Sequence, residues 1–252
     1  MKLFRLLFLI ALVGSVSLTA TSAARAADAS VYVVHGIPGH ALAPSLDPAL
    51  PVDVLVNNSV CLLKGLRFGE VAGPFTIPAG SYDFKISFAN TLSPCSNSTV
   101  IDASGVAFAD GENASVVAYL TAAAAPTAGK FDNNLSATPD GQARVILHHT
   151  AAAGAVDIVL NRPFGPTPLK LKLSGVTNGD QAAAYVTTSD PWLFNQTMPS
   201  LTIYPSGSRS AVFGPETLYL DPQSAYLLYA VGSPETGTFT VIKKEIKSVG
   251  KQ

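Results

Sequence analysis

Two short stretches of this sequence each occur twice, and together they decide the fold class. VYVVH at residues 31–35 is followed by VDVLVN at 52–57, and the pair returns as VILHH at 145–149 and VDIVLN at 156–161. Each pair consists of an apolar stretch that ends in His and a Val-Asp-aliphatic stretch that ends in Asn. Such β-branched runs are typical of strands, and their recurrence in one chain is typical of a duplicated domain. The sequence therefore predicts two copies of an all-β unit.

Runs of β-branched and aromatic residues bounded by Gly, Pro and Asn predict short strands throughout both copies. In the first copy the expected strands are 30–35, 52–57, 60–63, 71–77, 81–88, 98–102, 105–109 and 114–120. In the second copy they are 143–149, 155–160, 169–173, 180–187, 200–204, 216–220, 225–231 and 238–246. Strands at intervals of about 8–12 residues, with no helix expected after the N-terminal segment, indicate tandem antiparallel β-sandwiches of immunoglobulin-like type.

The order of further landmarks is the same in both copies and sets the domain boundaries. GLRFGE at 65–70, for example, corresponds to GVTNGD at 175–180. We place the first repeat at 27–121, the second at 143–247 and a tail at 248–252. The intervening 122–142 is rich in Ala, Thr, Pro, Asn and Gly, which predicts a partly extended interdomain linker, with Phe131 and Leu135 available to hold it against a domain.

The first 26 residues have the pattern of a secretory signal peptide. Lys2 and Arg5 precede an apolar run at 6–18, and small residues then lead to Ala24-Arg25-Ala26. The run is shorter than the roughly 20 apolar residues of a spanning helix, and Ala-x-Ala suits signal peptidase. We expect cleavage after Ala26, with Ala24 as the second choice and an uncleaved membrane helix as the alternative. The mature chain is then periplasmic, secreted or on the cell surface, without a transmembrane segment.

The charge balance of the mature chain argues against nucleic-acid binding. Cleavage would remove Lys2, Arg5 and Arg25, which reduces the 16 Lys and Arg residues to 13, against 17 Asp and Glu residues. A chain with an acidic balance lacks the positive surface that attracts phosphate groups.

Cys61 and Cys95 are the two cysteines, and both belong to the first repeat. In an oxidising compartment the expected state is a disulfide, and closing a loop of about 35 residues contributes on the order of 3 to 4 kcal/mol. A redox-active pair is the alternative, but the Cys-x-x-Cys spacing is missing. Because the second repeat has no Cys, we expect the disulfide to brace the first repeat locally.

Several of these features together resemble a known bacterial family. The strands at 31–35 and 52–57, the Gly-x-x-x-Gly-Glu step at 65–70, the Pro-Ala-Gly-x-Tyr turn at 78–82 and the Asp-Gly-x-x-x-Ser-Val-Val-Ala stretch at 110–118 resemble the extracytoplasmic domain of unknown function DUF4397. The resemblance implies β-sandwich modules of the envelope or exterior, often in tandem, without an established enzymatic activity. It covers both copies, although the second lacks the Pro-Ala-Gly-x-Tyr turn and has Asp190-Pro191-Trp192-Leu193-Phe194 near that place.

Four polar residues recur at matching positions and are candidates for a structural or functional role: His35, Asp53, His149 and Asp157. Histidines are zinc and copper ligands, and His40 and His148 lie nearby, but such a site needs three or four converging donors. We therefore expect the imidazoles to bond to loop backbone, and the carboxylates to face solvent, bond to a neighbouring loop or pair with the histidines. The sequence predicts no catalytic residue, metal site or cofactor, since serine-hydrolase and nucleotide-binding motifs are also missing.

Three aromatic residues of the second repeat are candidate ligand-binding residues: Trp192, Phe194 and Tyr204. Loops on a rigid sandwich commonly carry recognition, although for Trp192 we favour closure of the end of the second core, because a large apolar ring seldom stays exposed. The expected function is a non-catalytic binding module of the cell envelope, with an envelope protein, a glycan or a surface polymer as partner. The alternatives are a metal-dependent or hydrolytic enzyme that uses the His and Asp positions, and a structural spacer.

Overall fold

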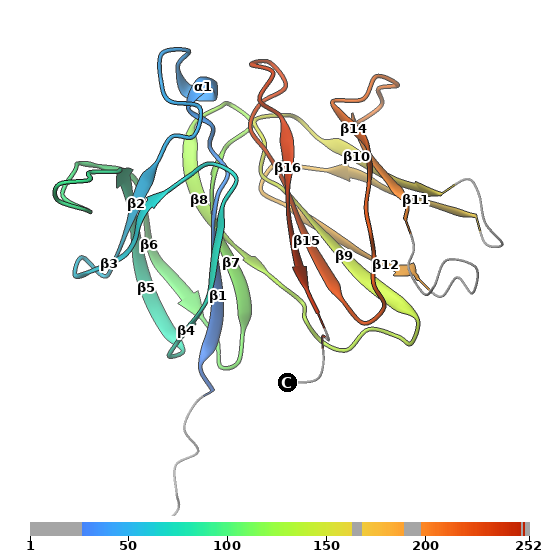
Figure 1. Ribbon diagram of the computed structural model, residues 1–252, viewed down its shortest axis with the longest axis horizontal. Helices are drawn as coiled ribbons and strands as arrows, with labels where there is room; N and C mark the ends of the chain where they lie inside the picture. The colour runs from blue at the N-terminus through green and yellow to red at the C-terminus, as the bar shows by residue number, and fades with distance from the viewer. Residues whose placement is uncertain (1–26, 163–167, 189–197, 248, 250–252) are drawn as a thin grey trace, which may run out of the picture.

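The computed structural model describes residues 27–162, 168–188, 198–247 and 249 (Figure 1). The predicted signal peptide, Trp192 and Phe194, and most of the predicted tail lie outside the described residues. Among the described residues, no helix is both long and apolar enough to cross a membrane.

The first repeat is a sandwich of two four-stranded sheets. Its inner sheet, which faces the second repeat, has the order β4-β1-β7-β8 and consists of Val71–Ile77, Ala29–His35, Asn113–Leu120 and Pro126–Asp132. Its outer sheet has the order β3-β2-β5-β6 and consists of Val60–Leu66, Val52–Val56, Gly80–Phe88 and Thr99–Phe108. One helical turn, α1 (Gly39–Leu42), lies between β1 and β2.

The second repeat has the same two-sheet architecture, which confirms the all-β tandem sandwich. Its inner sheet has the order β12-β9-β15-β16 and consists of Gln181–Thr187, Gln142–His149, Ala225–Val231 and Thr240–Ile246. Its outer sheet has the order β11-β10-β13-β14 and consists of Leu169–Val176, Val156–Arg162, Ser200–Pro205 and Phe213–Thr217. The predicted strands 98–102 and 105–109 form a single strand, β6.

One strand pair in each inner sheet is parallel, whereas the prediction was antiparallel throughout. β1 pairs with β7 so that His35 lies opposite Ala118, and β9 pairs with β15 so that His149 lies opposite Ala230. In each repeat the first strand, β1 or β9, therefore lies beside a strand from near the end of that repeat, β7 or β15. The equal register supports the duplication inferred from the sequence.

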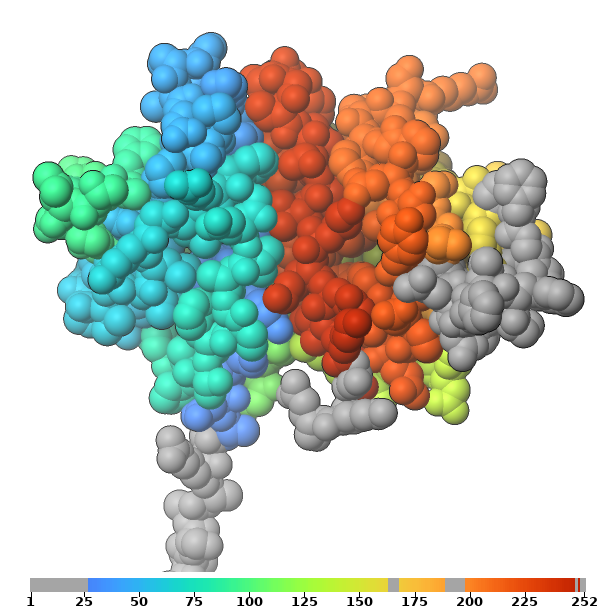
Figure 2. All heavy atoms as spheres, viewed as in Figure 1, coloured from blue at the N-terminus to red at the C-terminus, as the bar shows by residue number. Residues whose placement is uncertain are grey.

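The two inner sheets pack face to face, a question that the sequence left open. Between them lies an apolar cluster, which we call the interdomain core: Val34, Val117, Phe131, Ile146, Leu227, Tyr229, Val231 and Ile242. The central inner strands are thus covered on both faces, because their opposite faces line the cores of the two sandwiches. This explains why the sequence of β15 is almost uniformly apolar and why all seven of its residues are buried. Figure 2 shows the two repeats in direct contact.

The segment predicted as a linker, 122–142, differs from the prediction because half of it belongs to the first sandwich. β8 pairs antiparallel with β7 from Ala114 opposite Asp132 to Leu120 opposite Pro126. Its composition resembles that of a linker, but its place is set by Phe131, whose ring is buried in the interdomain core. The connection between the sandwiches is therefore confined to residues 133–141.

Candidate functional site

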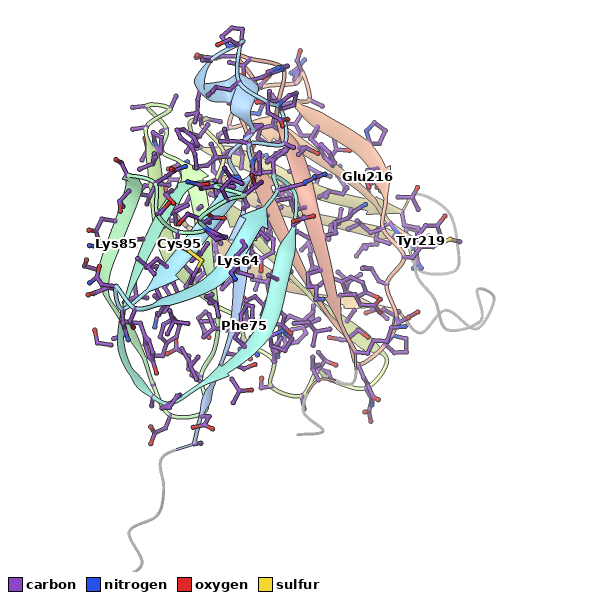
Figure 3. The ribbon with its side chains drawn as sticks, turned by 60° about the vertical axis from the view of Figure 1, so that its left-hand side comes forward. Lys64, Phe75, Lys85, Cys95, Glu216 and Tyr219 are labelled. Carbon is purple, nitrogen blue, oxygen red and sulfur yellow. A yellow bond between two sulfur atoms is a disulfide. The ribbon has the colours of Figure 1, made fainter. Side chains whose placement is uncertain are left out.

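The loop at residues 89–98 joins β5 to β6 and projects from the outer sheet of the first sandwich, at the left edge of Figures 1 and 2. The predicted disulfide is present: Cys95 of this loop is bonded to Cys61 of β3, with Cα atoms 5.9 Å apart. Figure 3 shows Cys95 beside Lys64 of β3. The disulfide therefore holds the loop against the edge strand of the sheet.

Asp53 lies at the base of the loop and anchors it a second time. The residue is 1% exposed. Its Oδ1 accepts a hydrogen bond from the Gly65 amide at 2.9 Å, and its Oδ2 accepts from the amides of Asn90 at 3.0 Å and Cys95 at 2.8 Å. Burial by itself raises the pKa of the Asp53 carboxyl, but these three amide donors outweigh burial and the pKa lies below its ordinary value.

Asn90 fixes the backbone of the loop from within. Its Oδ1 accepts hydrogen bonds from the amides of Leu92 at 3.1 Å and Ser93 at 3.0 Å. Its Nδ2 donates to Ser96 Oγ at 3.1 Å and to Asn97 Oδ1 at 3.3 Å. Side-chain bonds of this kind give a loop a defined shape without regular secondary structure.

Although the loop is held so firmly, it exposes an apolar side chain. Leu92 is 96% exposed, and Phe88 and Val100, at the two strand ends that flank the loop, are 41% and 46% exposed. Burial of a leucine side chain is worth about 1.5–3 kcal/mol, and here that energy is not used within the molecule. An exposed apolar group on a preorganised loop is suited to binding a partner, since little conformational entropy remains to be lost.

The second sandwich repeats the anchor but not the loop. Asp157 Oδ1 accepts from the Gly175 amide at 3.0 Å and from Ser206 Oγ at 3.1 Å, while Oδ2 pairs with Lys172 Nζ at 2.8 Å. Lys172, together with these donors, lowers the pKa of Asp157 to about 2. Gly65 and Gly175 both have positive φ angles, of 65° and 70°, and each directs its amide to the carboxylate. In each repeat the recurring Asp thus holds the backbone of the neighbouring strand, β3 or β11, at its glycine.

The strand-end histidines hold loop backbone. His35 Nε2 lies 2.7 Å from the Leu50 carbonyl, and His149 Nε2 lies 2.8 Å from the Gly154 carbonyl. Burial lowers the pKa of both imidazoles. His35 and Asp53 bind separate partners and do not form the pair considered above.

The described residues contain no group of three or more His, Cys, Asp or Glu side chains placed to hold a metal ion. His40, on α1, is exposed. Tyr204 lies on β13, half-buried and opposite Asp157 in register. The sequence analysis did not identify Leu92 as a candidate binding residue. The one feature that could have indicated it is an apolar residue in a polar stretch close to Cys95.

His148 has a role that the sequence did not predict, because it packs against the interdomain core. Its ring stacks on Tyr229 with centroids 4.6 Å apart and meets the edge of Phe131 at 5.2 Å. Nδ1 lies 3.3 Å from the Leu228 carbonyl, and the buried Nε2 has no hydrogen-bond partner among the described residues. Burial lowers the pKa of His148 from 6.5 to about 4. Tyr229 also bonds across the interface, with its hydroxyl 2.7 Å from Ser115 Oγ.

The chain is distantly similar to several solved structures. The Bacillus anthracis TIE protein is 9% identical, with a TM-score of 0.23; the match covers 89% of this chain and 33% of that one, so this chain spans about a third of its length. Two further structures are each described as a "putative cell adhesion protein". The one from Bacteroides uniformis is 13% identical, with a TM-score of 0.25, and the match covers 92% of this chain and 100% of that one. The one from Bacteroides ovatus is 11% identical, with a TM-score of 0.27, and the match covers 89% of this chain and 98% of that one. Likenesses this weak assign no activity to the chain.

The family comparison is more specific, whereas no curated protein matches the sequence. The model of the domain of unknown function DUF4397 matches residues 29–159. This match includes the whole first sandwich and reaches β10 of the second. Because it spans 131 of the 252 residues, the chain belongs to the DUF4397 family.

Proposed function

We propose that the protein is an exported, non-catalytic binding module of the cell envelope that recognises its partner through the loop at residues 89–98. The observation that carries this proposal is Leu92, which is 96% exposed on a loop braced by a disulfide and by Asp53. A leucine side chain gains most from an apolar pocket. An envelope protein is therefore a better partner than a hydrophilic glycan or surface polymer.

The covalent brace supports both the export and the binding role. A disulfide persists in oxidising compartments, such as the periplasm or the cell exterior. The second sandwich has no cysteine, and its corresponding loop at 206–212 contains Gly207, three serines and Arg209. The first repeat is thus the one specialised for recognition, while the second supports it through the interdomain core.

The state of the recurring polar residues supports a non-catalytic role. A general base needs an oxygen or nitrogen free to reach the proton it removes. Both oxygens of Asp53 accept backbone amides, and His35 bonds to the Leu50 carbonyl through Nε2 while its Nδ1 faces the Ile37 amide at 3.5 Å. His149 bonds to the Gly154 carbonyl through Nε2, and its Nδ1 is buried away from solvent. These side chains are engaged in holding turns and loops.

The decisive experiment places a photo-crosslinking amino acid at position 92 of the protein expressed in its native cells. The matched control carries the same group at Ser208, an exposed position in the corresponding loop of the second sandwich. We expect a discrete crosslinked partner from position 92 and none from position 208.

A second measurement compares the affinity of the wild-type protein and Leu92→Ser for isolated envelopes. Loss of 1.5–3 kcal/mol corresponds to a decrease of about 10- to 150-fold. Because Leu92 is exposed, its substitution should leave the melting temperature unchanged. Equal affinity of the two proteins would refute the role of the loop.

A further inference from the structure

A cavity of about 210 Å³ opens between the two sheets of the first sandwich. It lies at the edge bordered by β3 and β4, which Figure 3 marks with Lys64 on β3 and Phe75 on β4. The opposite edge of the sandwich is closed by Lys130 of β8, whose Nζ donates to the Ala107 carbonyl at 2.7 Å and pairs with Glu112 at 2.6 Å. The two edges of one sandwich are therefore built differently.

The cavity is an unfilled part of the core, lined from both sheets by apolar side chains. Its lining consists of Val31, Val56, Asn57, Ser59, Val60, Leu62, Phe75, Ile77, Tyr82 and Phe84. Val31 and Phe84 are each 2% exposed and belong to the core itself. Val60 lies opposite Val56 in register, on the side of β3 that faces the core, and yet it is 57% exposed. A core-facing valine remains this exposed because no residue in the described part of the chain covers the opening.

The second sandwich has different side chains at this place. Val60 lies opposite Val56 in register, and in the second sandwich Leu171 lies opposite Leu160, which is the residue that corresponds to Val56. Leu171 packs against the second core, whereas Lys172 points outward, to Asp157. The position that carries an exposed valine in the first sandwich therefore carries a larger side chain, packed against the core, in the second.

We propose that this cavity is a binding site for an uncharged, mainly apolar small molecule, such as a short alkyl or aryl compound. None of the described residues that line it is Lys, Arg, Asp, Glu or His, so a buried charge would find no partner among them. An apolar cavity of about 150 Å³ is large enough to bind benzene, so the present one accommodates a somewhat larger group. Asn57 and Ser59 are exposed at the mouth, where they meet a hydroxyl or carbonyl of the ligand.

This site goes beyond the binding role of the loop at 89–98 and is separate from it. Val52 of β2 pairs with Phe88, which leads into that loop, whereas Val56, at the other end of β2, leads into the turn that forms the cavity mouth. The two sites lie at opposite ends of the outer sheet. An experiment that disproves binding at one site therefore does not affect the proposal for the other.

The test is a titration of the isotope-labelled protein with 1-hexanol and p-xylene, followed by methyl NMR. We expect saturable shifts at Val56, Leu62 and Ile77, and at least tenfold weaker binding of the charged analogue hexanoate. Two variants should each weaken binding of 1-hexanol at least tenfold: Val60→Trp, which covers the mouth, and Leu62→Lys, which places a charge in the apolar lining. The matched control, Lys170→Trp, should bind as the wild-type protein does.

Three outcomes would overturn the proposal. The first is a wild-type protein without saturable shifts, and the second is binding that neither variant changes. The third is a concentration-dependent dimer, detected by light scattering, that covers the same methyl groups and prevents access of the probes. Val60 is exposed and Leu62 lies on an edge strand, so circular dichroism should show both variants folded.

Discussion

Protonation of His148 should destabilise the protein, because this imidazole lies between the two sandwiches without a charged partner. The ring is fully buried, stacked on Tyr229 and in contact with Phe131. Its Nδ1 faces the Leu228 carbonyl, so Nε2 is the atom that would take up a proton, and no described residue accepts a hydrogen bond from it. The informative variant is His148→Phe, which keeps an aromatic ring in the stack and removes the titration.

The sign and size of the effect follow from the pKa of His148 in the two states. Burial lowers the pKa from 6.5, its ordinary value and that of the unfolded chain, to about 4 in the folded protein. Above pH 6.5 both states are neutral at this residue and its titration has no effect on stability. As the pH falls from 6.5 to 4, the unfolded state binds the proton first, and the folded state loses about 3 kcal/mol at roughly 1.4 kcal/mol per pH unit. Below pH 4 the contribution of His148 changes no further.

The assay is urea denaturation of the wild-type protein and His148→Phe at several pH values between 7.5 and 4. At pH 7.5 the two unfolding free energies should agree within about 1 kcal/mol, since the variant loses one long hydrogen bond and one unpartnered nitrogen. At pH 4 the variant should be the more stable by about 3 kcal/mol relative to that baseline. His35 and His149 also have lowered pKa values, but they titrate in both proteins and cancel in the difference. Parallel curves for the two proteins would refute the reasoning.

Three further predictions concern the contacts that hold the loop and the interface. Cys61→Ala combined with Cys95→Ala should lower the unfolding free energy by about 4 kcal/mol, because the disulfide closes a loop of 34 residues in sequence; wild-type protein denatured with reductant should show the same loss. Asp53→Ala leaves the amides of Gly65, Asn90 and Cys95 without their acceptor and should cost about 2–4 kcal/mol, measured by denaturation, whereas a loss below 1 kcal/mol would mean that water replaces the carboxylate. Ser115→Ala and Tyr229→Phe should each cost about 1 kcal/mol and be coupled in a double-mutant cycle, and strict additivity would show that the 2.7 Å contact between the hydroxyl groups contributes nothing.

The sequence alone predicted the features that depend on local pattern. Alternating and β-branched runs placed nearly all the strands, because the side-chain period of a strand is a property of neighbouring residues. The duplicated His and Asp positions were identified because the same local pattern occurs twice in the sequence. The disulfide was expected because the sequence has two cysteines and an N-terminal segment that predicts export. β8 was missed because its Pro, Gly and Ala residues resemble a linker, and it is held by the burial of Phe131 against the other repeat.

Only the tertiary structure decided the features that depend on surfaces far apart in sequence. His148 alternates with the core residues of β9. Its stacking on Tyr229 depends on the pairing of β9 with β15, and its contact with Phe131 of the first repeat depends on how the two sandwiches dock. Leu92 is exposed, and the β3–β4 edge is open, because none of the described elements covers them. Local pattern determines which way a side chain points from its strand, whereas what it meets there depends on the packing of the whole chain.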